Sequence, residues 1–395
     1  MNISGNSYSA ARQVTNGGNR RIRSFLCFFE KGRAFLATVM LGLPAFSAPV
    51  SAETPPVDAV FQPEAVLKLM HLTNDWQKAH PRVKETDRNW ERGTWYTGVM
   101  AAHKTTRDPR FLDQAMAWGQ QHHWQVSPGI LGGNRLFCVE TWVELYLEKK
   151  DPAMIAPTIQ WLATPASNSP AGAKVWYRGK GGVYADSLYG APALAMLAQA
   201  TGDRKYLAYL HPFWADVSEE LFDKDDSLFY RDRSFIGKRS SGGKKIFWSR
   251  GNGWVMGGLV RVLEYLPTDD PARGQYVEQF KAMAVAVSNR QPSDGLWRCN
   301  LDDPSHFPMP ESSGSGFLCY AITWGMNRGI LDRITFEPVV RKAWRGLTGV
   351  VSSEGQVQYG QLVGDRPTEI KQENTHEYVT GAFLLAASEI YKLGK

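Results

Sequence analysis

The fold is decided by a stretch that reads Val183-Tyr-Ala-Asp-Ser-Leu-Tyr-Gly-Ala-Pro-Ala-Leu-Ala-Met-Leu197. This stretch is almost entirely apolar, and Asp186 carries its only charge. From Ala191 onward the small and apolar residues predict a buried helix, with Pro192 in the first turn, where its missing N–H costs little. Asp186 is therefore expected just ahead of a helix, beside Tyr184 and Tyr189.

Two interpretations of Asp186 follow from its position. An Asp at the start of a helix commonly accepts backbone N–H bonds and acts as an N-cap. Alternatively, apolar walls disfavour the charged carboxylate and raise its pKa, so that it holds a proton near neutral pH and can donate it. The stretch alone favours the cap, and the rest of the chain has to decide between the two.

The same pattern recurs along the chain: a loop leads into an apolar helix, and a turn with Asp or Pro leads into a more amphipathic one. Apolar helices are predicted to start near Thr94, Cys138, Asp186, Asn252, Ser313 and Glu377. Amphipathic partners are predicted after Pro63, to about Ala79, and from near Asp108, Asp151, Asp203, Asp270 and Glu337. A repeating helical hairpin cannot bury its own apolar face, so neighbouring hairpins must pack together.

Six such hairpins predict an all-α fold, a closed (α/α)6 toroid with apolar helices inside and amphipathic helices outside. Short β-like pieces at residues 227–230 and 355–359 are predicted to form loop hairpins at the barrel mouth. Residues 61–395 are expected to form this one catalytic domain, preceded by a short tail over 53–60.

The N-terminal segment has the features of a bacterial secretory signal. Basic residues precede an apolar run from Ala34 to Ala48, and Val50-Ser51-Ala52 fits a cleavage site with small residues. The run is too short to span a bilayer comfortably. We therefore interpret residues 1–52 as a signal peptide and expect a periplasmic or secreted protein that has no membrane partner once the signal is removed.

The signal also accounts for most of the basic character. The whole chain has 45 basic and 39 acidic residues, of which six and one lie in residues 1–52. The remainder has 39 basic and 38 acidic residues. This balance gives no support to nucleic-acid binding, which needs a basic stripe. We expect a monomer or a homodimer.

Cysteine usage argues against a disulfide framework or a structural metal. Cys27 belongs to the signal, which leaves Cys138, Cys299 and Cys319, and a Cys299–Cys319 disulfide is possible. Cys and His residues are not clustered at metal-ligand spacings. We therefore expect neither a metal nor another cofactor.

In a toroid the loops before the inner helices meet at one rim, so their side chains are the candidate site. Aromatic, basic and amide side chains there suit an anionic sugar, with aromatic platforms for the ring and a guanidinium for a carboxylate. The predicted substrate-binding residues are Trp90, Trp95, Asn134, Arg135, Lys180, Tyr184, Trp248, Arg250, Asn252, Trp254, His306 and His376.

Arg250 lies in the most distinctive of these loops, Phe247-Trp-Ser-Arg-Gly-Asn-Gly-Trp254. A guanidinium beside a helix start can hold a carboxylate bidentately. It can equally brace the toroid by binding carbonyl groups at a helix end. Trp248 and Trp254 likewise suit either a sugar platform or the core.

Several motifs, in order, resemble glycoside hydrolase family 105, which is close to family 88. They are Trp-Ser-Arg-Gly-Asn-Gly-Trp (248–254), Gly-Leu-Trp-Arg (295–298), Pro-Glu-Ser-Ser-Gly-Ser-Gly-Phe (310–317), Ala-Ile-Thr-Trp-Gly-Met-Asn-Arg-Gly-Ile-Leu (321–331) and Gly-Ala-Phe-Leu-Leu-Ala-Ala-Ser-Glu-Ile (381–390). The resemblance covers nearly all of residues 61–393 and independently implies an (α/α)6 barrel.

The resemblance also implies an activity, that of an unsaturated rhamnogalacturonyl or glucuronyl hydrolase. Such enzymes act on lyase products of pectin rhamnogalacturonan, ulvan or similar polymers, which carry a C4=C5 double bond in the terminal uronic acid. An acid protonates C4, water adds at C5, and the product opens to a 5-keto-4-deoxyuronate and the remaining sugar. Asp186 matches the family's acid by its place in Tyr-Ala-Asp-Ser-Leu-Tyr.

One position departs from the family pattern. Relatives carry a second Asp in the loop before the second inner helix, where this sequence has Asn134 or Arg135. Asn134 can still bind a hydroxyl but cannot act as a base. Glu140 is expected a turn into the helix in a structural role, and Glu311 is expected to brace a helix start.

Two other functions remain open from the sequence. Another (α/α)6 enzyme, a polysaccharide lyase or an epimerase, would use a different base, for which Tyr177 with His306 is a weak candidate. A sugar-binding toroid without activity would fit the missing second Asp.

Overall fold

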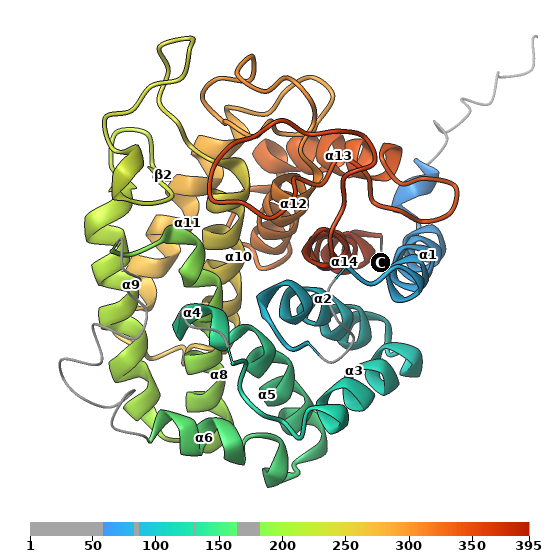
Figure 1. The fold of residues 1–395 in the computed structure, drawn as a ribbon, viewed down its shortest axis with the longest axis vertical. Helices are drawn as coiled ribbons and strands as arrows, with labels where there is room; N and C mark the ends of the chain where they lie inside the picture. The colour runs from blue at the N-terminus through green and yellow to red at the C-terminus, as the bar shows by residue number, and fades with distance from the viewer. Residues whose placement is uncertain (1–57, 83–86, 129–131, 164–181, 395) are drawn as a thin grey trace, which may run out of the picture. The chain divides into compact units, whose positions relative to one another are not determined.

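In the computed structural model, which describes residues 58–82, 87–128, 132–163 and 182–394, the apolar helices form an inner ring. Each inner helix contacts the next, and the last returns to the first (Figure 1). Their bounds are α2 (Trp90–Thr106), α5 (Phe137–Lys149), α8 (Pro192–Thr201), α10 (Ser249–Tyr265), α12 (Ser312–Asn327) and α14 (Glu377–Leu393). The inner starts expected from the sequence match these helices to within a few residues, except at α8. There the 3-10 helix η3 (Ala185–Gly190) precedes the α-helix.

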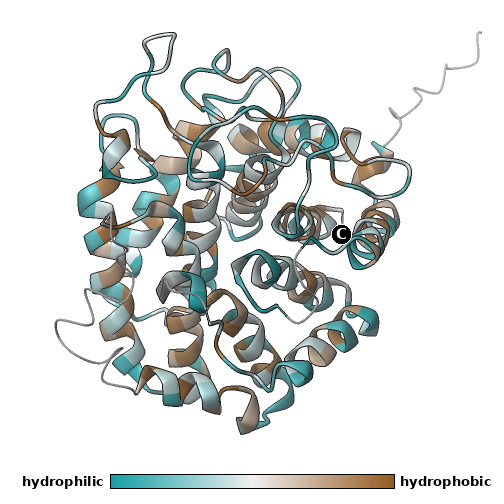
Figure 2. Cartoon of the chain, in the orientation of Figure 1, coloured by the Kyte–Doolittle hydropathy of each residue, from teal (hydrophilic) through white to brown (hydrophobic). Residues whose placement is uncertain are grey.

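The amphipathic helices lie outside this ring (Figure 1). They are α1 (Pro63–Ala79), α3 (Pro109–Gln121), α6 (Ala156–Leu162), α9 (Leu207–Leu221), α11 (Arg273–Ser288) and α13 (Arg333–Gly349). Figure 2 shows teal and brown residues mixed along them, as expected for helices with one face on the ring and one in solvent. The (α/α)6 prediction is confirmed.

Aspartates in the turns start several outer segments, as the sequence predicted. Asp108 accepts a hydrogen bond from the Arg110 N–H at 2.9 Å and caps α3. Asp151 caps η2 (Pro152–Met154), which precedes α6, and Asp203 caps η4 (Arg204–Tyr206), which precedes α9. Each cap satisfies an N–H group that the helix itself cannot bond.

The ring closes where α2 meets α14. A Cβ on Gly98 would lie 2.5 Å from the Gly381 carbonyl oxygen, and one on Gly381 would lie 2.4 Å from the Thr94 oxygen. The backbones of the two helices are therefore in direct contact. Beside this crossing, the buried Arg92 guanidinium pairs with Glu377 at 2.8 Å and joins the same two helices.

Irregular structure is concentrated in the loops. Strands β1 (Phe222–Asp223) and β2 (Leu228–Phe229) form the first predicted hairpin, and a Val351–Val357 bridge marks the second. The short segments η1 (Ala59–Phe61), α4 (Gly132–Arg135) and η5 (Arg233–Phe235) complete the described elements.

Three other sequence expectations concern the ends and the cysteines. Residues 58–60, assigned to the tail, pack on α13, where the Trp344 indole N–H donates to the Val60 carbonyl at 2.8 Å. Cys138, Cys299 and Cys319 are buried free thiols, so a Cys299–Cys319 disulfide is not formed.

Within the described ranges, none of the helices is long and apolar enough to cross a membrane. The predicted signal, 1–52, lies outside those ranges.

We predict that Gly98→Ala lowers the free energy of unfolding by about 1–3 kcal/mol, because the new methyl group must push α14 away from α2. Urea unfolding followed by circular dichroism measures the change. Gly274→Ala in α11 is the matched control, since its Cβ meets nothing within 4 Å. Equal stability of the two variants would contradict a backbone contact at the ring closure.

Candidate active site

A cavity of about 160 Å³ opens at the rim where the inner helices begin. It is lined by Trp90, Asn134, Phe137, Tyr184, Asp186, Ser187, Arg231, Trp248, Arg250, Trp254 and Gly364. These residues come from the starts of α2, α5 and α10, from α4, from η3 and the residue before it, and from the loops after β2 and before α14. The expectation that rim loops converge on one site therefore holds for most of the loops.

Asp186 lies in the first turn of η3 and caps neither adjacent helix. The N-cap of η3 is Tyr184 and that of α8 is Ala191. Its side chain is partly exposed, at 27%, while its Oδ1 atom is buried and has no hydrogen-bond partner among the described residues. The helix-cap interpretation is therefore wrong, and the carboxyl group faces the cavity.

Opposing effects set the protonation of Asp186. Burial raises the pKa of its carboxyl group above the usual range, because the charged form loses solvation. The positive charges of Arg231 and Arg250 work against this rise, and Asp232 adds to it. The balance favours a carboxyl that keeps its proton at a higher pH than an ordinary Asp.

Aromatic rings form one wall of the cavity. Trp254 is buried and packs against Tyr189 and Phe317, at ring-centroid distances of 4.9 and 4.4 Å. Trp90 is partly exposed and stacks on Tyr378 at 5.2 Å. Trp254 thus serves the core and the cavity at once, and Trp90 offers the more accessible ring.

Arg250 lines the cavity and also braces the loop before α14. Its Nη1 donates to the Gln361 carbonyl and to the Tyr378 hydroxyl, and its Nη2 donates to the Leu362 carbonyl at 3.0 Å. Its guanidinium lies 4.6 Å from the centre of the Trp248 ring. The two interpretations of Arg250 are therefore compatible, but three of its N–H groups are already committed to protein acceptors.

Among the other predicted residues, Asn134 and Tyr184 line the cavity. Arg135 instead points to α6, with its guanidinium 5.6 Å from the centre of the Trp161 ring. Lys180 lies outside the described residues, as do Trp176 and Tyr177.

Trp95 and Asn252 lie away from the cavity, and their predicted substrate contacts are not supported. The Trp95 indole N–H donates to Asn74 of α1 at 2.9 Å, so the ring faces the outer helices. The sequence placed Trp95 in a loop, but α2 already begins at Trp90, which turns Trp95 to another face. The Asn252 amide is buried and bonds the backbone of Phe229 and Trp248.

The two histidines that were predicted to contact the substrate, His306 and His376, do not line the cavity. His306 is partly buried and packs at a tilt against Phe307. His376 is the N-cap of α14 and accepts the Glu377 N–H at 3.0 Å. Burial lowers the pKa of His376 to about 4, and the charges of Arg250 and Arg82 contribute to this. His376 is therefore neutral at neutral pH and suited to its capping role.

Glu140 and Glu311 have the structural roles that the sequence predicted. Glu140 is fully buried and pairs with Arg261 of α10, and burial raises its pKa to about 7 against the attraction of that arginine. Glu311 caps α12 by accepting the N–H groups of Ser313 and Gly314. Neither side chain reaches the cavity, and no group of metal-ligating residues occurs within the described ranges.

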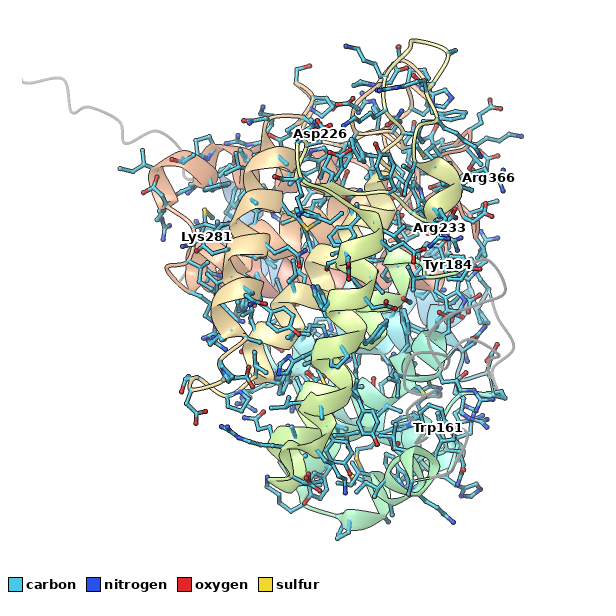
Figure 3. The ribbon with its side chains drawn as sticks, turned by 90° about the vertical axis from the view of Figure 1, so that its left-hand side faces the viewer. Trp161, Tyr184, Asp226, Arg233, Lys281 and Arg366 are labelled. Carbon is cyan, nitrogen blue, oxygen red and sulfur yellow. The ribbon has the colours of Figure 1, made fainter. Side chains whose placement is uncertain are left out.

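Four residues of the cavity were not expected from the sequence: Phe137, Ser187, Arg231 and Gly364. Arg231 is the most consequential, because its Nε lies 3.5 Å from Asp186 Oδ1 and its guanidinium stacks over the Tyr184 ring at 4.2 Å. The sequence contains one signal for Arg231: the charged residues Arg231 and Asp232 directly follow a strand that was predicted at the barrel mouth. In Figure 3, Tyr184 lies at the same edge of the view as Arg233, two residues from Arg231, while Lys281 is at the opposite edge.

We predict that Arg250→Met lowers the free energy of unfolding by about 1–3 kcal/mol, because the Leu362 carbonyl loses its charged donor and the Gln361 carbonyl keeps only the Tyr378 hydroxyl. Urea denaturation measures the loss. Arg366→Met is the matched control on the same loop, since the Arg366 side chain is 60% exposed. If Arg250→Met is as stable as this control, the hydrogen bonds of Arg250 to the loop before α14 do not stabilise the fold.

Comparison with known proteins identifies the family. The profile of Glycosyl Hydrolase Family 88 matches residues 65–394. An unsaturated 3S-rhamnoglycuronyl hydrolase from Formosa agariphila is 33% identical over 339 residues, which cover 81% of this chain and 88% of that protein.

Solved structures agree with this match. A family 88 glycosyl hydrolase from Bacteroides vulgatus has a TM-score of 0.76 at 27% identity, covering 84% of this chain and 99% of that one. A structure described as a polysaccharide lyase has a TM-score of 0.74 at 30% identity, covering 84% of this chain and 98% of that one. The resemblance noted in the sequence is confirmed, and the chain is a glycoside hydrolase that belongs to glycosyl hydrolase family 88.

Proposed function

We propose that this enzyme hydrates the C4=C5 double bond of an unsaturated uronic acid at the non-reducing end of an oligosaccharide. The observation that carries the proposal is Asp186, a carboxyl group with a raised pKa that faces a cavity between aromatic rings and two arginines. A raised pKa lets this group keep and donate a proton at a higher pH than an ordinary Asp can.

The reaction needs one group that gives and then takes a proton. The Asp186 carboxyl donates its proton to C4, and the electrons of the double bond form the new C4–H bond. The positive charge that develops at C5 is shared with the ring oxygen. A water oxygen then bonds to C5 while its proton passes to the Asp186 carboxylate.

The hydrated product is a hemiketal at C5 and opens without further help from the enzyme. The bond from C5 to the ring oxygen breaks and leaves a ketone at C5. The hemiacetal at C1 then collapses to an aldehyde and releases the neighbouring sugar as an alcohol. The products are a 4-deoxy-5-keto uronate and a shortened oligosaccharide.

The cavity supplies the binding groups that this substrate requires. Trp90 offers an accessible apolar ring face, and Asn134 offers an amide for a hydroxyl. Arg250 and Arg231 place positive charge where the uronate carboxylate would lie. Asn134 cannot act as a base, so we assign activation of water to Asp186 itself.

The leaving sugar is inferred from the relatives. The protein from Formosa agariphila is named for a 3S-rhamnoglycuronyl substrate, and a second protein of that name, from an Alteromonas species, is 39% identical over 209 residues. We therefore favour a uronate linked to rhamnose as the substrate. The apolar run and cleavage site within residues 1–52 support action in the periplasm or outside the cell.

A polysaccharide lyase is the second candidate, because one similar solved structure is described as such. A lyase creates the double bond that a hydrolase removes, so the two activities change the ultraviolet absorbance of the sugar in opposite directions. The suggested base pair is not supported, because His306 does not line the cavity.

We predict that Asp186→Asn lowers kcat on a lyase-generated unsaturated disaccharide by about 10²–10⁴-fold, since the amide cannot donate an acidic proton. Loss of the double-bond absorbance measures the rate. Asp203→Asn in an outer turn is the control and keeps wild-type activity. Full activity of Asp186→Asn would remove Asp186 from the reaction, and rising absorbance on intact polymer would indicate a lyase.

A second prediction concerns the substrate's charge. The methyl ester of the same unsaturated disaccharide should have a kcat/KM at least about 10-fold lower, because charge-assisted hydrogen bonds to the arginines are lost. The ester keeps the double bond and the leaving sugar, so the same absorbance assay applies. Equal kcat/KM values would show that the cavity does not recognise a carboxylate.

A further inference from the structure

Arg231 and Asp186 lie on the cavity wall as an oppositely charged pair. Arg231 Nε lies 3.5 Å from Asp186 Oδ1, and neither atom has a hydrogen-bond partner among the described residues. The Arg231 side chain is only 15% exposed, and it lies directly on the cavity wall. Arg231 is therefore placed to act as the counterion of the Asp186 carboxylate.

Other contacts hold Arg231 without using up its donors. Its Nη1 donates to Asp232 Oδ2 at 2.8 Å, and its guanidinium face rests on the Tyr184 ring at 4.2 Å. Its carbonyl accepts the Ala185 N–H at 2.9 Å, which ties the loop after β2 to η3. These contacts hold the guanidinium at the cavity wall, where it can bind a planar, charged acceptor.

The chemistry of the proposed substrate places its carboxylate close to Asp186. The carboxylate is attached to C5, and C5 is bonded to C4, the atom that Asp186 protonates. Whatever cation binds this carboxylate must therefore lie beside Asp186. Arg231 meets this condition at 3.5 Å, whereas three N–H groups of Arg250 are committed to Gln361, Leu362 and Tyr378.

We propose that Arg231 is the counterion of Asp186 in the empty site and becomes the counterion of the substrate carboxylate when a uronate binds, so that Asp186 takes up a proton together with the substrate. This inference rests on the proposed function. Two carboxylates that share a site repel each other, which raises the pKa of one of them. The incoming carboxylate competes for Arg231, and the Asp186 carboxyl becomes neutral when it is needed as an acid.

The charged groups that face Asp186 are consistent with this exchange. Arg231 and Asp232 follow β2, Arg250 comes from α10, and Tyr184 precedes η3. Asp365, on the loop before α14, interacts electrostatically with Arg231. Burial already raises the pKa of Asp186, and Arg231 is the largest opposing charge, so moving its charge to the substrate raises that pKa further.

The proton balance closes over one turnover. Asp186 takes one proton from solvent as the substrate binds and gives it to C4. The attacking water returns a proton to Asp186. When the uronate product leaves, Arg231 pairs with Asp186 again and the proton returns to solvent.

The first test measures proton uptake without turnover. Methyl β-glucuronide, which has a carboxylate and no double bond, is titrated into the protein in buffers of different ionisation enthalpy. We expect uptake that approaches one proton for wild type and none for Asp186→Asn. Binding with no proton uptake by wild type would overturn the inference, while hydration of unsaturated substrates would still stand.

The second test uses pH profiles. In Arg231→Gln, the alkaline limb of kcat/KM should move up by about one pH unit or more, since Asp186 loses its counterion in the free enzyme. KM for the unsaturated disaccharide should rise by about 10- to 100-fold, since the carboxylate loses a charged donor. Arg231→Lys keeps the charge and should restore the position of the limb.

Arg233→Gln is the matched control. Arg233 lies two residues along, its side chain is 69% exposed, and it pairs with Glu220. We expect its KM and both pH limbs to equal those of wild type. A purely structural role for Arg231 would lower activity without moving the kcat/KM limb, and that result would overturn the inference.

Discussion

The contact between α2 and α14 is the constraint on which the rest of the structure depends. Here the backbones touch, because Gly98 and Gly381 carry no side chains at the crossing, and the Arg92–Glu377 pair joins the same helices. A toroid has no free helix face only if its first and last inner helices meet. That closure brings the rim loops from distant parts of the chain onto one cavity.

At that rim, structural and chemical roles fall on the same residues. Arg250 holds the loop before α14 through the carbonyls of Gln361 and Leu362, and it also lends positive charge to the cavity. Trp254 packs in the core and forms part of the wall. Asp186 differs from both residues, because it caps no helix. Burial disfavours the charged form of its carboxyl group, whereas the charges of Arg231 and Arg250 favour that form. This balance leaves its protonation open to what enters the cavity.

The fold could be predicted from the sequence more fully than the site. Small apolar residues recur in six inner segments, and an Asp lies near the start of most of the outer ones. Both signals act locally, so the helices and the toroid followed from them. The site residues were chosen by loop membership alone. This criterion gave the wrong result for Trp95, because α2 starts earlier than expected and turns the indole towards α1. The same criterion gave the wrong result for Asn252, because its side-chain amide forms hydrogen bonds with the backbone of Phe229 in β2.

The sequence by itself determined the helical hairpins, the family resemblance and the choice of Asp186, because periodicity and motifs are properties of neighbouring residues. Only the tertiary structure decided what Asp186 faces. Arg231 is 45 residues further along the chain and reaches Asp186 through the β1–β2 hairpin. Charge acts through space, so the pairing that governs the acid could not be read along the chain and follows only from the closed ring.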